Sequence, residues 1–143
     1  MFEAKNDAAK LRRKVIRAAY RNEAIWDVLL NESEAKAGPS DGACLICAKA
    51  ILHDFGRGEL VRIVSDANGG QTEHYGALVD GVIYDLEGDC DSPEEWIKRF
   101  SELEAPYVRG RKLSFAFGLD EKSEIVDDEA ASKKVADLMK CNA

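Results

Sequence analysis

The sequence predicts a single α+β domain, in which helices and a small antiparallel sheet come from separate stretches of the chain. The 143 residues match the usual length of one domain, so we expect one domain over residues 1–143. Apolar residues recur at helical spacing before residue 36, and short β-type runs surround a turn signal at Asp80-Gly81. These observations predict the order helix, helix, three strands, helix, strand, helix.

The first helical region is expected at about residues 7–36, as an extension that precedes the core. Its apolar residues recur every three to four positions, which predicts one long helix or two helices broken near Asn22. Its basic residues, among them Arg13 and Arg17, are expected to form a solvated helix face. The segment from Gly38 to Gly42 is dense in helix breakers and ends this region.

A second helix is expected to begin at Cys44. The stretch from Cys44 to Leu52 is apolar on nearly every side, which predicts a buried helix. Gly56 or Gly58 supplies its C-cap. Cys44 therefore lies where a loop becomes a helix, and the positive end of the helix dipole favours the thiolate form there.

The predicted sheet has four strands. One covers residues 60–64, and two flank the Asp80-Gly81 turn, which places Val79 opposite Val82. The last is expected at residues 112–117, after a helix that runs from a Ser92 cap to about residue 104. A final helix is expected at about residues 128–140, with Asp127 as a candidate cap.

The hairpin brings a histidine and an aspartate together. Directly paired and next-but-one residues share a sheet face, so His74, Gly76 and Asp85 face the same way. Asp85 is the diagonal neighbour of His74, and Gly76 opposite it leaves the approach open. The imidazole can then donate one ring proton to the carboxylate and keep its other nitrogen free. Glu87 is the alternative partner, and an exposed polar pair at the sheet end is the alternative to a functional pair.

Cys44 is the best candidate for a nucleophile that such a base would deprotonate. Cys47 lies one turn further into the apolar helix and is expected to pack as a small hydrophobe, with Cys47 as the reactive thiol in place of Cys44 being the alternative.

The order of these features resembles the transglutaminase-like branch of the papain-like cysteine hydrolases. The features are Gly42-Ala43-Cys44 at the start of a buried helix, His74 at the start of a strand, a hairpin, and the strand Val82-Ile83-Tyr84-Asp85. The resemblance covers roughly residues 40–90. It implies a papain-like core at about residues 40–118, in which the cysteine helix packs on a small antiparallel sheet.

The resemblance implies that Cys44 is the nucleophile, His74 the base and Asp85 the residue that orients the base. The implied activity is acyl transfer from an amide, isopeptide or thioester, with a peptide or protein as substrate or partner and with no cofactor or metal. The glutamine that papain-like peptidases place before the cysteine is absent here, and the sole glutamine is Gln71. Only the Cys44 backbone N–H is therefore assigned to an oxyanion hole.

Three alternatives remain open from the sequence. A papain-like scaffold with a degenerate triad would bind a protein partner without catalysis. Cys44-x-x-Cys47 is also a spacing used in thiol redox chemistry. A zinc site from Cys44, Cys47, His74 and Cys90 has suitable ligand types.

The charge balance excludes some classes of function. With 20 basic and 27 acidic residues the net charge is −7, which argues against nucleic acid as a ligand. There is no apolar run long enough for a transmembrane helix and no secretory signal, so we expect a cytoplasmic protein with reduced cysteines. Cys141, near the end of the chain, has no evident partner.

Overall fold

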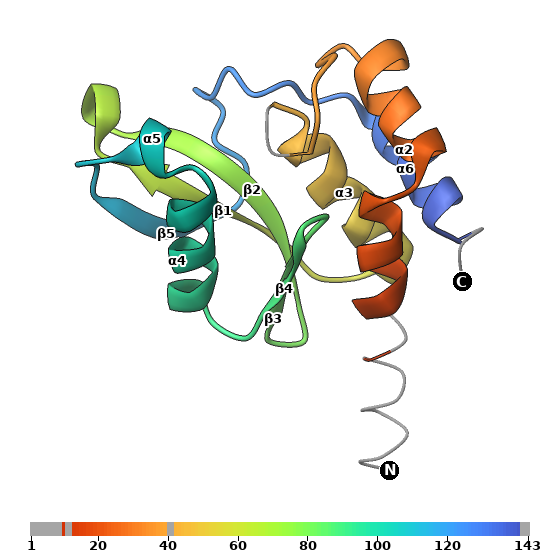
Figure 1. The fold of residues 1–143 in the computed structure, drawn as a ribbon, viewed down its shortest axis with the longest axis horizontal. Helices are drawn as coiled ribbons and strands as arrows, with labels where there is room; N and C mark the ends of the chain where they lie inside the picture. Colours follow the sequence, from red (N-terminus) through yellow and green to blue (C-terminus); the bar gives the residue numbers. More distant parts are fainter. Residues whose placement is uncertain (1–9, 11–12, 40–41, 141–143) are drawn as a thin grey trace.

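The computed structural model describes residues 10, 13–39 and 42–140. Five antiparallel strands form one sheet in the order β4-β3-β2-β1-β5, with helices against both of its faces (Figure 1). This mixture of helices and an antiparallel sheet confirms the predicted α+β class. The beginning of the expected N-terminal helix and Cys141 lie outside the described residues. No helix in the described part is both long enough and apolar enough to cross a membrane.

The N-terminal region forms two helices broken near Asn22, which is the second of the two alternatives that the sequence leaves open. Residues 13–20 are helical, and α2 (Glu23–Asp27) follows them. The side chain of Asn22 accepts a hydrogen bond from the N–H of Ala24, which makes Asn22 the N-cap of α2. A π-helical turn, η1 (Val28–Glu32), continues α2, so the helical region ends at residue 32 instead of near residue 36.

The predicted buried helix is α3 (Cys44–Phe55), in which eight of 12 residues are buried. It ends at Gly56, whose φ of 73° is the left-handed conformation that glycine adopts without strain. A short link then leads into β1 (Glu59–Ser65).

The predicted hairpin consists of β2 (Gln71–Val79) and β3 (Val82–Asp85). Val79 pairs with Val82, which confirms the register that the Asp80-Gly81 turn predicts. The two turn residues have φ values of 51° and 82°, as a two-residue hairpin turn requires.

The sheet contains one strand more than the sequence predicts. β4 (Gly88–Cys90) pairs with β3 and forms one edge of the sheet, and β5 (Leu113–Phe117) forms the other edge. β4 has three residues with an aspartate in the middle, so it shows no apolar alternation by which it could be recognised.

A β-bulge interrupts β2 next to His74. His74 lies opposite Ile63 of β1, but the next residue of β1, Val64, lies opposite Thr72. Glu73 is therefore the extra residue of β2. Bulges bend a strand and re-aim the side chains beside them, and here the bulge sets the direction of His74 and Glu73.

The helix that follows β4 begins as predicted. α4 (Pro93–Leu103) has Ser92 as its N-cap, whose hydroxyl accepts a hydrogen bond from the N–H of Glu95. A short helix, α5 (Ala105–Val108), follows directly and was not predicted.

The cap of the last helix differs from the sequence prediction. Asp128, rather than Asp127, precedes α6 (Glu129–Lys140) and accepts a hydrogen bond from the N–H of Ala131. Asp127 instead accepts a hydrogen bond from Lys49 of α3 at 2.8 Å.

Two apolar layers cover the two faces of the sheet. Helix 13–20, α2, α3 and α6 pack on one face, against side chains of β2 and β3. α4 and α5 pack on the other face, mainly through Trp96, Phe100 and Val108. Consequently α3 and α4 approach the same part of β2 from opposite sides.

We expect the substitution Gly76→Ala to lower the free energy of unfolding by about 1–3 kcal/mol, because an added Cβ would lie 2.6 Å from Trp96. The φ of Gly76 is not positive, so the loss would report crowding and not backbone strain. Urea unfolding measures it, with Ser114→Ala on exposed β5 as the control. Equal stability of the two variants would contradict close packing of Trp96 on β2.

Candidate active site

His74 and Asp85 are in direct contact. Nε2 of His74 and Oδ2 of Asp85 are 3.0 Å apart, and both side chains are buried. The diagonal relation across the hairpin therefore brings the two side chains together as the register predicts. The exposed polar pair that the sequence left open as an alternative does not describe this contact, because the side chains are 4% and 8% exposed.

The carboxylate of Asp85 accepts hydrogen bonds from four donors, whereas the sequence predicts only the one from His74. Oδ2 accepts from His74 and from Nε1 of Trp96 at 2.9 Å. Oδ1 accepts from Arg99 at 2.7 Å and from the backbone N–H of Glu87 at 3.0 Å. Glu87 thus supports Asp85 through its backbone and does not replace it as the partner of His74.

The space over Gly76 is occupied, contrary to the open approach that the sequence suggested. Trp96 lies where a side chain at position 76 would be, and it has no exposed surface. The glycine therefore makes room for the indole that donates to Asp85. His74 is enclosed on the same side, with its ring 5.7 Å from that of Trp96 and stacked on Phe100 at 5.2 Å.

Cys44 meets this pair from the other face of the sheet. It is the first residue of α3 and is 3% exposed. β3 ends at Asp85, so no strand of the described chain pairs with His74 on that side of β2. The first turn of α3 can therefore approach the imidazole past the end of β3.

The electrostatic environment keeps the His74–Asp85 pair charged. Burial opposes the imidazolium, but the hydrogen bond to Asp85 and the interactions with Cys44 and Asp85 raise the pKa of His74 to about 10. Burial likewise disfavours the carboxylate, but His74, Arg99 and Trp96 together lower the pKa of Asp85 to about 2. Nδ1 of His74 is buried and has no hydrogen-bond partner among the described residues.

Cys44 also lines a pocket of about 350 Å³. Phe100 of α4, Tyr107 of α5 and Glu104 between the two helices also line it. It adjoins a second hollow of about 810 Å³, and the two share Gly42, Gln71, Thr72, Tyr107 and Ile125. Cys44 thus borders the cleft, although only 3% of its surface is exposed.

Cys47 differs from Cys44 in its surroundings. It is buried within α3, and burial raises the pKa of the Cys47 thiol well above its usual value, so the side chain stays protonated. Within the described chain, no group of three or more His, Cys, Asp or Glu side chains is arranged to hold a metal ion.

The sequence did not reveal the roles of Trp96 and Arg99. Neither residue was assigned to the site from the sequence. The two residues are three positions apart on α4, so they lie on one helix face, and this spacing is the signal by which both could have been assigned to the sheet side.

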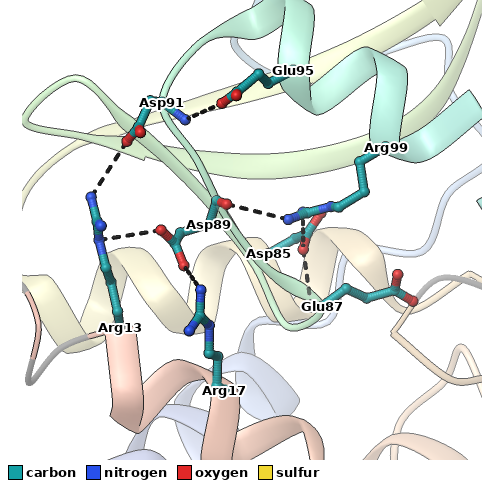
Figure 2. A network of polar contacts seen from close by, with 8 residues as sticks. All are labelled: Arg13, Arg17, Asp85, Glu87, Asp89, Asp91, Glu95 and Arg99. Carbon is teal, nitrogen blue, oxygen red and sulfur yellow. Dashed lines mark hydrogen bonds and ion pairs between the residues drawn. The ribbon is translucent and has the colours of Figure 1, made fainter.

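The basic run of the N-terminal helix is only partly solvated, which corrects the sequence prediction. Arg13 and Arg17 lie 3.2 and 2.8 Å from the carboxylate of Asp89 in β4 (Figure 2). Arg13 also lies 3.4 Å from Asp91. The charge run therefore docks this helix on the edge of the sheet.

We expect the stability of the protein to fall from about pH 6.5 toward pH 10, because the His74 imidazolium is retained over this range only in the folded state. Asp85 acts in the opposite direction and loses its contribution as the pH falls from 3.8 toward about 2. Urea unfolding at several pH values measures both effects.

His74→Gln removes the imidazole and should flatten the alkaline loss, whereas His53→Gln should keep it. An alkaline loss that is the same in both variants would show that His74 does not hold its proton in the folded protein.

No protein-family model, curated protein or solved structure matches the chain significantly. What this site does must therefore be inferred from the geometry of its own residues.

Proposed function

We propose that the protein is a cysteine-dependent acyl-transfer enzyme with a papain-like core of the transglutaminase-like type. In this proposal Cys44 is the nucleophile, His74 the base and Asp85 the residue that orients the base. The observation that carries it is the buried imidazole, which is bonded to Asp85 through Nε2 and interacts with Cys44. Among the described cysteines, Cys44 alone both begins a helix and lines a pocket.

The proposed reaction begins with attack of Cys44 Sγ on the carbonyl carbon of an amide, isopeptide or thioester. The thiol proton passes to His74, and the raised pKa of His74 favours a resting thiolate–imidazolium pair. When the bond to the leaving group breaks, His74 returns the proton to that group and a thioester remains on Cys44. Water or an amine, deprotonated by His74, then attacks the thioester and releases the thiol.

The environment of each group fits its proposed task. Asp85 holds Nε2, which leaves Nδ1 for the proton transfers with Cys44. The first-turn N–H groups of α3, beginning with that of Cys44, have no acceptor within the helix and point toward its N-terminal end. Such groups stabilise an oxyanion that forms at the thiol.

A peptide or protein substrate suits the cleft beside Cys44. The hollow extends from the thiol along the start of β2 to the loop that includes Asp120 and Lys122. The two parts of the hollow have volumes of about 350 and 810 Å³. Tyr107, which is 74% exposed, stands between its two parts and offers an apolar contact to a bound chain.

Labelling with a neutral chloroacetamide at about pH 7 should modify Cys44 first, because the thiolate is the reacting species. Cys44→Ala should abolish the fast labelling, and Cys47→Ala should keep it. His74→Ala should slow it by about 100-fold or more, as expected for the loss of a positioned base. Mass-spectrometric mapping of the modified peptides follows each rate.

If Cys44 in the wild type reacts no faster than an ordinary exposed thiol, the catalytic proposal fails. A binding module with a degenerate triad would then be the better description. If the fast labelling disappears in Cys47→Ala and persists in Cys44→Ala, then Cys47 and not Cys44 is the reactive thiol.

We expect Asp85→Asn to lower the rate of acyl transfer from an activated ester by about 10²–10⁴-fold, because the imidazole loses the partner that fixes its tautomer. Release of the leaving group, together with the mass of the acyl-enzyme, measures this rate. Glu94→Gln on the exposed start of α4 is the control. A similar rate in both variants would show that Asp85 has only a structural role.

A further inference from the structure

Strand β4, which forms the edge of the sheet next to Asp85, is bound to the N-terminal helix by ion pairs. Asp89 belongs to β4, and its side chain is only 8% exposed. Its two carboxylate oxygens lie 2.8 Å from Arg17 and 3.2 Å from Arg13, both from helix 13–20. A buried carboxylate needs such partners, so this helix and β4 are joined by more than apolar packing.

Arg99 connects the same strand to the candidate active site. One of its guanidinium nitrogens donates to Oδ1 of Asp85 at 2.7 Å, and the other lies 3.5 Å from the backbone oxygen of Asp89 (Figure 2). A Cβ at position 88 would lie 3.1 Å from that second nitrogen, and the φ of Gly88 is +147°. Glycine at position 88 therefore lets Arg99 lie between Asp85 and β4.

We propose that Asp89 is a positioning residue of the candidate active site, through which helix 13–20 fixes the carboxylate of Asp85. Arg13 and Arg17 hold Asp89, Asp89 holds β4 in place, and β4 together with Asp85 fixes Arg99. This inference rests on the proposed function, and it adds that the N-terminal helix is required for a reactive Cys44.

The geometry explains why such a support is needed. β4 has three residues and lies at the edge of the sheet, paired only with β3. A strand this short is held weakly by its own ladder. The ion pairs of Asp89 with helix 13–20 lie on the side of β4 that faces away from Arg99 (Figure 2). They therefore restrain β4, whose Asp89 backbone oxygen is one of the two contacts of Arg99. A loosened Arg99 leaves Oδ1 of Asp85 with the Glu87 N–H alone.

The test compares Asp89→Asn and the double variant Arg13→Gln/Arg17→Gln with the wild type in the full chain. Glu32→Gln is the matched control, since it removes an exposed ion pair with Lys134 that lies outside this network. Both network variants should slow chloroacetamide labelling of Cys44 by about fivefold or more, because small displacements of a catalytic group cost large factors in rate. The control should change the rate by less than about twofold.

A second readout follows His74 directly. The chain has two histidines, so NMR titration in a His53→Gln background reports the imidazole of His74 alone. The groups that act on it among the described residues are Asp85 from β3, Cys44 from α3 and, through Asp85, Arg99 from α4. Looser positioning of Asp85 should lower the pKa of His74 in both network variants. A loss of overall stability alone would not lower this pKa while the protein remains folded.

The outcomes separate the two proposals. Slower labelling with a lowered pKa of His74, in variants that unfold cooperatively, supports the positioning role. Unchanged labelling and an unchanged His74 titration overturn it, even if wild-type Cys44 is highly reactive. If wild-type Cys44 proves to be an ordinary thiol, the proposed function fails, and the NMR titration still decides whether Asp89 positions Asp85. Arg17→Gln alone, at a 65% exposed side chain, serves if Asp89→Asn does not fold.

Discussion

The buried carboxylate of Asp85 is the group on which the arrangement of this part of the molecule depends. A charge that has been removed from water must be compensated by donors in good geometry, and removal of one partner of a buried pair costs about 3–5 kcal/mol. Four donors reach Asp85, from the strand before it, the turn after it and the helix beyond. The close packing of α4 and the two glycines that admit Trp96 and Arg99 serve this requirement, within a hairpin whose register the Asp80-Gly81 turn fixes.

The same requirement links the two faces of the sheet. α4 supplies the donors on one face, and α3 brings Cys44 from the other face past the short end of β3. The start of β2, up to the bulge at Glu73, lines the cleft together with Cys44 and Phe100. The cleft therefore lies where the sheet is interrupted, and its chemistry depends on an irregularity rather than on regular structure.

Much of this could be predicted from local sequence signals. The Asp80-Gly81 turn fixes the register and hence the pairing of His74 with Asp85, and the run after Cys44 predicts a buried helix. The contacts that were missed are those between elements far apart in the chain. Nothing near Arg17 in the sequence indicates Asp89, and nothing near Gly76 indicates Trp96. A strand as short as β4 carries no periodic pattern, and a bulge depends on how two strands pair, so neither is visible in one stretch of sequence.

The contacts of Asp85 with His74, Trp96 and Arg99 join residues that are 11, 11 and 14 positions apart. Closing loops of this length costs little chain entropy, so we expect His74 and Asp85 to come together within a local unit of the chain. Cys44 belongs to a different segment, and it meets His74 only when α3 docks against β2. In a nascent or partly unfolded chain, Cys44 therefore lies away from His74 until α3 has docked.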